Sequence, residues 1–187
     1  PGVEPVLELA TTKKLLVYSG DAHPELAQDI ATHLGVKLGE PNLRTFPNGE
    51  LHCRFDESIR GADVFIIQTH CGTVNDSVMQ QLLMIDAARG ASAGQITAVM
   101  PHYAYARSDK KDASRISIGG RLVADMLSTA GVDRVLTMNL HAPQVHGFFS
   151  VPVDHLTALG VIADHYRDRD LSNTVVVSPD LGNAKQA

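Results

Sequence analysis

The sequence predicts an α/β protein built on a doubly wound, mostly parallel β-sheet. Short apolar runs rich in β-branched residues, such as Val64–Thr69, alternate along the chain with helix-length amphipathic segments. Strands that are apolar along their whole length are typical of parallel sheets covered on both faces. Glycine follows several of the expected helices, at the position where a left-handed residue commonly ends a helix. These features together favour strands alternating with covering helices.

The elements follow from this alternation in chain order. The apolar runs predict strands at Leu15–Ser19, Leu51–Phe55, Val64–Thr69, Ile96–Met100, Val135–Leu140 and Thr174–Ser178. The amphipathic segments between them predict helices at His23–Leu34, Asn75–Arg89, Gly119–Ala130 and Leu156–Arg167. The first three helices are expected to end at Gly35, Gly90 and Gly131, because glycine adopts the left-handed C-cap conformation without a steric cost.

The chain is expected to contain a short tail, a first domain and only the beginning of a second domain. Residues 1–12 predict an N-terminal tail, residues 13–153 a first domain and residues 154–187 the beginning of a second, similar domain. The chain ends shortly after the predicted strand Thr174–Ser178, and Gly182–Ala187 predicts a helix that has only started. A last strand without its covering helix is unusual for a complete domain, so we expect a chain truncated early in the second domain.

Composition excludes several function classes. The formal net charge of -5 disfavours a nucleic-acid surface, which is normally basic. No apolar run approaches the roughly 18 to 20 residues that span a bilayer, and we expect no membrane association. The cysteines, Cys53 and Cys71, lack metal-ligand spacing, which favours reduced thiols in a cytoplasmic protein.

One short stretch is basic in spite of the acidic total. It carries Arg107, Lys110, Lys111, Arg115 and Arg121 against Asp109 and Asp112. On charge alone it suits either a small anionic ligand or a solvated surface. Its first part, Tyr103–Lys111, directly follows a predicted strand, and ligands of open α/β sheets collect at the carboxyl ends of strands. Guanidinium and ammonium groups placed there suit phosphate oxygens.

Other segments carry further candidate chemistry. His141 opens a loop after the strand Val135–Leu140, where an imidazole either faces a metal or fills a structural role. Phe46–Glu50 contains Pro-Asn-Gly, which first of all predicts a turn between strands. Asp180 follows the last predicted strand and offers the oxygen ligand that Mg²⁺ prefers over imidazole.

Several of these motifs resemble one known family in sequence order. From Asn139 to Asp154 the chain is similar to the signature of ribose-phosphate diphosphokinases (phosphoribosyl-pyrophosphate synthases), with matches at His141, Gln144, Gly147, Phe148, Phe149, Pro152 and Asp154. The segments Tyr103–Lys111, Phe46–Glu50 and Ser178–Asp180 resemble other motifs of this family. The likeness covers the chain from about Lys14 onward and implies a phosphoribosyltransferase-like fold.

The resemblance implies the following roles. The residues expected to bind ATP are Phe46, Asn48, Gly49, Glu50, Arg107, Ser108 and Asp109. His141 and Asp180 are expected to bind Mg²⁺, and Ser58 and Arg60 match positions of an allosteric nucleotide or phosphate site. In the family the Phe46–Glu50 loop reaches the ATP site of a neighbouring subunit, so a homo-oligomer is implied, and the family suggests a hexamer.

The chain also departs from the family pattern. Asn139 stands where the family usually has aspartate, and Ser108 stands where it has glutamine. Gly119 and Gly120 replace residues that firm up a helix start, so we expect a looser start of that helix.

The activity implied is Mg²⁺-dependent transfer of the diphosphoryl group of ATP to the 1-hydroxyl of ribose 5-phosphate, which gives phosphoribosyl pyrophosphate and AMP. The family's catalytic loop and ribose-phosphate loop follow later, so no catalytic residue is expected within this chain, which alone should be inactive. The departures keep open a non-catalytic regulatory paralogue that binds nucleotide and assembles with active subunits. A zinc hydrolase is disfavoured, because no histidine pair has the spacing of a shared zinc site.

Overall fold

The computed structural model describes residues 13–181 and residue 184. The predicted tail 1–12 and the predicted helix start after Gly182 therefore fall outside the described residues, Ala184 apart. The chain divides into two units, Pro1–Leu156 and Thr157–Ala187. The predicted domain boundary after residue 153 remains a prediction, although the strand that includes this position pairs with the first unit.

The first unit contains a six-stranded sheet in the order β2-β1-β5-β6-β7-β8, and every neighbouring pair is parallel. Its strands, in chain order, are β1 (Leu15–Ser19), β2 (Leu38–Gly39), β5 (Asp63–Ile67), β6 (Gln95–Met100), β7 (Arg134–Met138) and β8 (Val153–Leu156). The helices of this unit are α1 (Pro24–Leu34), α2 (Val74–Gly90), α3 (Gly119–Ala130) and the short 3₁₀ helix η1 (Pro143–Phe148). The predicted fold class is confirmed.

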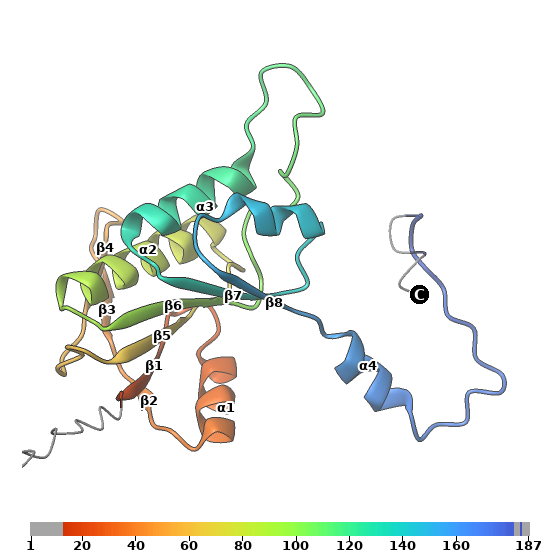
Figure 1. Ribbon diagram of the computed structural model, residues 1–187, viewed down its shortest axis with the longest axis horizontal. Helices are drawn as coiled ribbons and strands as arrows, with labels where there is room; N and C mark the ends of the chain where they lie inside the picture. Colours follow the sequence, from red (N-terminus) through yellow and green to blue (C-terminus); the bar gives the residue numbers. More distant parts are fainter. Residues whose placement is uncertain (1–12, 182–183, 185–187) are drawn as a thin grey trace, which may run out of the picture. The chain divides into compact units, whose positions relative to one another are not determined.

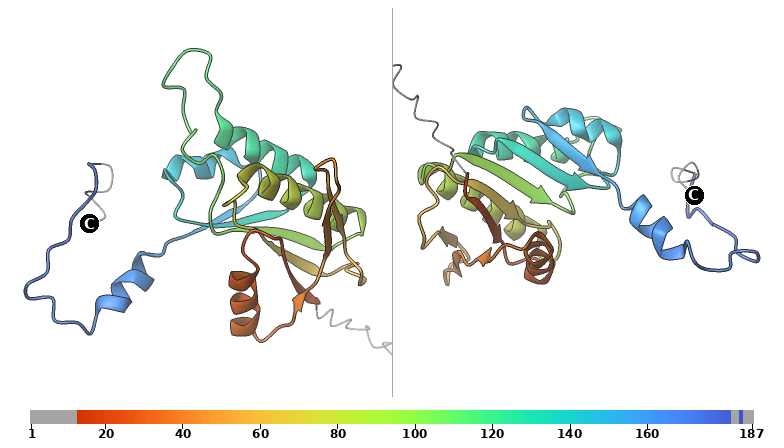
Figure 2. Two further views of the ribbon diagram at one scale, coloured as in Figure 1. Left: turned by 180° about the vertical axis from the view of Figure 1, so that it is seen from behind. Right: turned by 60° about the horizontal axis from the view of Figure 1, so that its bottom comes forward.

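Helices cover both faces of this sheet. In Figure 1, α2 and α3 lie above the strands and α1 lies below them, and the view from behind in Figure 2 agrees. The larger core fills the space between the sheet and α2 and α3, with Val64, Ile66, Ile85 and Leu127 among its buried residues. A smaller cluster, which includes Val17 and Ala27, joins the sheet to α1.

Alternation along the strands explains these two cores. Val64 and Ile66 of β5 belong to the larger core, whereas Ile67 belongs to the smaller one. Successive side chains of a strand point to opposite faces, so an apolar run without polar interruption feeds both layers. The continuous apolar pattern that predicted parallel strands therefore has this physical origin.

Glycine ends two helices as predicted and not the third. Gly35 and Gly131 have φ of 67° and 109°, and each donates its N–H to carbonyls of the preceding turn. The expectation for Gly90 is wrong, because Gly90 is the last residue of α2 and the C-cap is Ala91, with φ of -81°. The positive φ that follows this helix falls on Ser92 instead.

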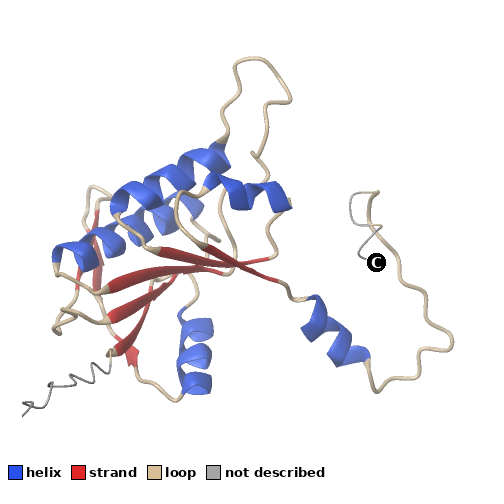
Figure 3. Ribbon diagram, viewed as in Figure 1, coloured by secondary structure: helices blue, strands red, loops and turns tan. Residues whose placement is uncertain are grey.

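A separate antiparallel hairpin stands beside the sheet. Its strands are β3 (Asn42–Thr45) and β4 (Leu51–Arg54). The predicted turn between strands is confirmed, since Gly49 has φ of 88° and donates its N–H to the Phe46 carbonyl oxygen at 2.8 Å. Figure 3 shows these strands in red apart from the larger sheet.

The second unit contains the helix α4 (Leu159–Tyr166), which is shorter than the predicted Leu156–Arg167. The predicted strand Thr174–Ser178 is wrong, because these residues have no regular structure. Val175, Val176 and Val177 are all exposed, and a strand needs a hydrogen-bonded neighbour that this segment lacks among the described residues. Within the described part of the chain, no helix combines the length and the apolar character needed to cross a membrane.

The α3 packing gives a stability prediction. Leu127 is fully buried, and we expect Leu127→Ala to lower the free energy of unfolding by about 2 to 5 kcal/mol through lost burial and a residual cavity. Leu122 lies on the same helix and is 57% exposed, so Leu122→Ala should change the free energy of unfolding by less than about 0.5 kcal/mol. Urea unfolding of both variants tests the prediction, and equal losses would contradict the assignment of the buried face.

Candidate functional site

The principal candidate site lies at the carboxyl ends of β6 and β7. These strands are parallel neighbours, so the loops that follow them leave the sheet at the same edge. The loops enclose a pocket of about 520 Å³ lined by His102, Tyr103, Tyr105, Ala106, Arg107, Asn139, Leu140 and His141. The structure thus brings together Arg107 and His141, which the sequence analysis assigned to phosphate and metal binding from separate motifs.

The β6 loop is anchored by a buried imidazole that the sequence analysis did not identify. His70 follows β5, and its Nδ1 accepts the Ala104 N–H at 3.0 Å. Its Nε2 lies 2.8 Å from Gln81 Oε1 of α2. The backbone N–H of His70 donates to the His102 carbonyl oxygen at 2.9 Å. Because Nδ1 accepts, the neutral ring carries its proton on Nε2 and donates it to Gln81.

Burial keeps this imidazole neutral. Desolvation lowers the pKa of His70 from 6.5 to about 4, although the Gln81 hydrogen bond opposes the shift. The sequence carries no local signal for this pair, because Gln81 lies 11 residues further along the chain and its burial is evident only from the fold. The buried imidazole therefore fixes the start of the loop that carries Arg107.

Two aromatic residues link the β6 loop to its surroundings. Tyr103 is buried, donates its hydroxyl to the Gly120 carbonyl oxygen at 2.7 Å and packs its ring 5.3 Å from that of Phe149. Tyr105 is half-exposed, has φ of 57° and donates its hydroxyl to Asn75 of α2. The loop is thus attached to α2, to α3 and to the segment after η1.

Ser108 has a structural use in this chain. Its hydroxyl accepts the Gly119 N–H at 2.9 Å and donates to the Ser117 carbonyl oxygen at 3.1 Å, while its carbonyl oxygen accepts the Gly120 N–H at 3.1 Å. The first N–H groups of a helix have no partner within the helix, and Ser108 supplies acceptors for two of those at the start of α3. Its predicted contact with ATP remains untested.

The expectation of a loose start to α3 remains a prediction, although the structure shows hydrogen bonds that hold this start. Ser108 satisfies the first N–H groups, and α3 begins at Gly119 as predicted. A Cβ on Gly119 would lie 3.1 Å from the Tyr105 ring, and one on Gly120 would lie 3.1 Å from the Tyr105 carbonyl oxygen. The glycines therefore allow close packing of Tyr105 against the helix start.

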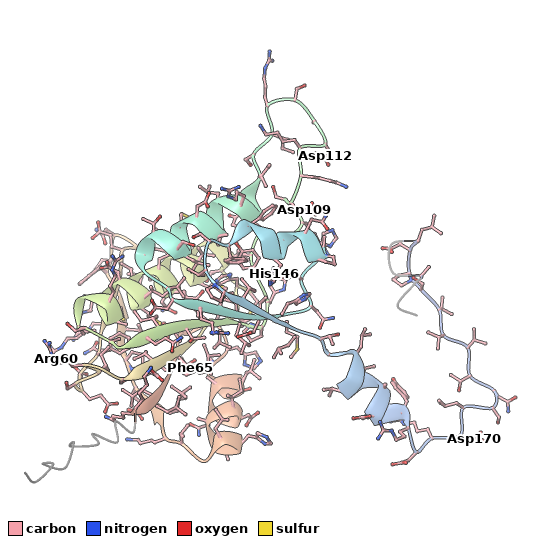
Figure 4. The ribbon with its side chains drawn as sticks, in the orientation of Figure 1. Arg60, Phe65, Asp109, Asp112, His146 and Asp170 are labelled. Atoms are coloured by element: carbon pink, nitrogen blue, oxygen red, sulfur yellow. The ribbon has the colours of Figure 1, made fainter. Side chains whose placement is uncertain are left out.

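Asp109 lies at the base of the projecting basic loop, on which Asp112 stands further out (Figure 4). Asp109 is buried and accepts a hydrogen bond of 2.9 Å from Gln144 Nε2 of η1. Gln144 belongs to the segment that carries His141, so this bond ties the two pocket loops together. The predicted role of Asp109 in ATP binding remains untested.

The hairpin residues predicted to bind adenine do not line the pocket of Arg107 and His141. Phe46 is half-exposed at the turn, and the Asn48 side chain accepts the Glu50 N–H at 3.2 Å. Gly49 lines another pocket of about 310 Å³, beside Asp21 after β1 and Gln68 after β5. The turn leaves the Phe46 ring accessible to another molecule.

Ser58 and Arg60 lie near the amino ends of the strands, whereas the principal pocket lies at the carboxyl ends. They precede β5, and Figure 4 shows Arg60 at the far end of the strands from Asp109 and His146. Both are exposed and line a pocket of about 360 Å³ together with Arg54. Their predicted allosteric role is untested, but any ligand they bind would be separate from the Arg107 pocket.

The predicted metal ligands belong to different units. His141 is exposed in the principal pocket, and Asp180 lies in the second unit, where its carbonyl oxygen accepts the Ser178 hydroxyl at 2.6 Å. Among residues 13–181 and 184, no group of three or more histidine, cysteine, aspartate or glutamate side chains is placed to hold a metal. Mg²⁺ commonly keeps several waters and uses few protein ligands beside substrate phosphates, whereas a structural zinc site needs four protein ligands. A single exposed ligand is therefore compatible with Mg²⁺ and not with a structural zinc site.

Comparisons with known proteins support the sequence resemblance. Residues 15–131 match the family model described as the N-terminal domain of ribose phosphate pyrophosphokinase. The chain is 57% identical over 94% of its length to a putative ribose-phosphate pyrophosphokinase of Streptomyces coelicolor, and 56% identical over 92% to the ribose-phosphate pyrophosphokinase of Deinococcus radiodurans. It spans 55% of each of these two relatives.

A solved structure shows the same fold. The crystal structure of phosphoribosylpyrophosphate synthetase from Mycobacterium smegmatis matches with a TM-score of 0.85 and 48% identity. The match covers 93% of this chain and 59% of that one.

The buried His70 predicts an acid-sensitive fold. Because its pKa is about 4 in the folded state and 6.5 ordinarily, the unfolded chain binds the proton first as the pH falls. The stability that His70 contributes is fully present above pH 6.5 and is lost as the pH falls toward 4. At 1.36 kcal/mol per unit, this difference corresponds to about 3 kcal/mol.

Urea unfolding between pH 7 and pH 4 measures this loss. The variant His70→Leu should be less stable at pH 7, yet its stability should fall by less over this interval than that of the unmodified chain. His33→Gln, an exposed change on α1, should retain the original pH dependence. An unaltered slope in His70→Leu would show that other groups cause the acid sensitivity.

Proposed function

Because the chain belongs to the ribose-phosphate pyrophosphokinase family, we propose that it is the nucleotide-binding part of an enzyme that transfers the diphosphoryl group of ATP to ribose 5-phosphate. The observation that carries the proposal is the pocket between the β6 and β7 loops. It combines the Arg107 guanidinium, an imidazole from His141 and aromatic residues at the carboxyl edge of a parallel sheet. The products of the reaction are phosphoribosyl pyrophosphate and AMP.

The chemistry of the pocket suits a triphosphate. Phosphoryl transfer depends on positioning and on neutralising phosphate charge more than on covalent catalysis. Arg107 is exposed to the pocket on a loop whose base is fixed by His70 and Tyr103, so its planar guanidinium is offered to phosphate oxygens from a defined backbone. The basic residues further along the loop add positive charge that favours an anionic ligand.

Mg²⁺ is the metal that this proposal includes. His141 would hold it from the β7 loop, and Asp180 is the second ligand that the family resemblance suggests. When bound, Mg²⁺ neutralises charge on the phosphates of the nucleotide. The contribution of the chain is to present His141 in the same pocket as Arg107, which the shared edge of β6 and β7 achieves.

Phe46 supports the further proposal of a homo-oligomer. Its ring is half-exposed at the tip of the hairpin, while Asn48 and Gly49 are engaged in the turn itself. A large exposed aromatic ring on a rigid turn is suited to stack on a planar base that another subunit holds. We propose that Phe46, with Glu50 beside it, completes the ATP site of a neighbouring copy.

Nucleotide binding by this chain tests the phosphate site directly. We expect Arg107→Ala to weaken the binding of MgATP about tenfold to a hundredfold, since a hydrogen bond to a charged group contributes roughly 1.5 to 3 kcal/mol. Arg89→Ala removes an exposed arginine at the end of α2 and should bind as the unmodified chain does. Calorimetric titration measures both, and equal affinities would contradict the assigned phosphate contact.

Mixed oligomers test the role of Phe46. In a chain extended to the full length of the relatives, Phe46→Ala and Arg107→Ala should each lower the rate of AMP formation from ATP and ribose 5-phosphate. After their subunits are mixed and reassembled, roughly a quarter of the sites should combine an intact Phe46 from one copy with an intact Arg107 from another. Recovery of activity supports sharing, and no recovery contradicts it.

The same assay separates the enzyme from the regulatory alternative. An unmodified full-length chain that binds MgATP but forms no AMP would favour a nucleotide-binding regulator. AMP formation at a rate that depends on ribose 5-phosphate supports the enzyme.

A further inference from the structure

The β7 strand ends in a sharp backbone turn at Asn139. The Asn139 N–H still donates to the Leu156 carbonyl oxygen of β8 at 3.1 Å, as the parallel ladder requires. Asn139 itself has φ of 50°, in the left-handed region that asparagine tolerates better than most non-glycine residues. The chain therefore leaves the ladder at this residue, one position before Leu140 and two before His141.

Leaving the ladder removes the strand partner of the next N–H group. That group belongs to Leu140, and it donates to Nε2 of His155 at 3.0 Å. His155 lies on β8 directly beside Thr137 of β7, so its side chain is on the same face of the sheet as that of Thr137. A side chain of β8 thus supplies the acceptor for the first N–H group beyond the ladder.

The same device holds the other loop of the pocket. His70, which follows β5, accepts the Ala104 N–H through a ring nitrogen at 3.0 Å. In the sheet order, β5 flanks β6 and β8 flanks β7. Each of the two inner strands therefore continues into a loop held by an imidazole from the neighbouring chain segment: His155 lies on β8, and His70 lies just after β5.

We propose that His155 is a positioning residue that sets the location of His141 in the nucleotide pocket. This inference rests on the proposed function, because it gives the hydrogen bond a use in ligand binding. His155 does not line the pocket, and it acts through the Leu140 backbone. Without an acceptor at residue 155, the Leu140 N–H turns to water, and the backbone next to His141 loses the side-chain hydrogen bond that fixes it.

His155 differs from His70 in a way that makes the proposal testable. His70 is fully buried, so its removal affects the whole fold, whereas His155 is exposed. Replacing an exposed ring leaves the core intact, and the global stability of the variants should stay close to that of the unmodified chain. A local effect on the β7 loop is then separable from unfolding.

The experiment compares His155→Ala with His155→Gln. Alanine removes the acceptor, while the glutamine side-chain carbonyl lies about as far from the backbone as Nε2 of histidine and offers an acceptor again. His33→Ala, an exposed histidine change on α1, is the matched control. For each chain, amide hydrogen exchange is followed residue by residue, MgATP affinity is measured by calorimetry and the urea midpoint is recorded.

We expect His155→Ala to speed exchange of the Leu140 amide about fivefold to tenfold, as for the loss of one hydrogen bond, with the urea midpoint unchanged. MgATP affinity should fall about tenfold, because a small displacement of His141 weakens its interaction with the bound ligand. His155→Gln should restore a substantial part of both, and His33→Ala should alter neither.

The outcomes separate this inference from the proposed function. Unchanged Leu140 exchange, or unchanged MgATP affinity despite faster exchange, overturns the positioning role of His155 and leaves the nucleotide site standing. Failure of the unmodified chain to bind MgATP overturns the proposed nucleotide site and, with it, the positioning role. Equal losses in His155→Ala and His155→Gln also overturn the role, because they would show that the acceptor is not what matters.

Discussion

The parallel pairing of β6 with β7 is the constraint on which the candidate site depends. It places the residues after Met100 and those after Met138 at one edge of the sheet, although they are far apart in sequence. The pairing is stabilised because apolar residues of both strands are buried against α2 and α3 on one face of the sheet. Arg107 and His141 can therefore share a pocket without touching the core, and changes in these loops need not affect the packing that holds the strands.

Much of the fold could be predicted from local patterns, and the exceptions have physical causes. The bounds of β1 and α3 agree with the predicted Leu15–Ser19 and Gly119–Ala130, because an apolar run and a helix bounded by glycine are locally determined. β8 was missed, since Val153–Leu156 is short and polar at Asp154, whose carboxylate pairs with Arg134 across the strand at 2.7 Å. Thr174–Ser178 shows the reverse error: its β-branched composition favours a strand, but composition supplies no partner.

The candidate site could be predicted in part. Arg107 and His141 were identified from motifs, and their convergence followed from the rule that ligands bind at the carboxyl ends of strands. The groups that hold the two loops were not identified, because a histidine such as His70 becomes informative only when its buried partners are known. The motif predicts that Ser108 contacts the nucleotide, and the hydrogen bond of its hydroxyl to the start of α3 could not be predicted from it. Side-chain hydrogen bonds to distant backbone groups leave no periodic trace in a sequence.

The most direct test of the nucleotide site is paramagnetic broadening by MnATP, with Mn²⁺ standing in for Mg²⁺ at oxygen and imidazole ligands. Broadening of backbone amide resonances reports which residues approach the metal of the bound nucleotide. We predict selective broadening at residues 103–107 and 139–141, with the amides near Ser58 and Arg60 unaffected. Broadening centred on Arg60, or no selective broadening at saturating MnATP, would contradict a phosphate site between the β6 and β7 loops.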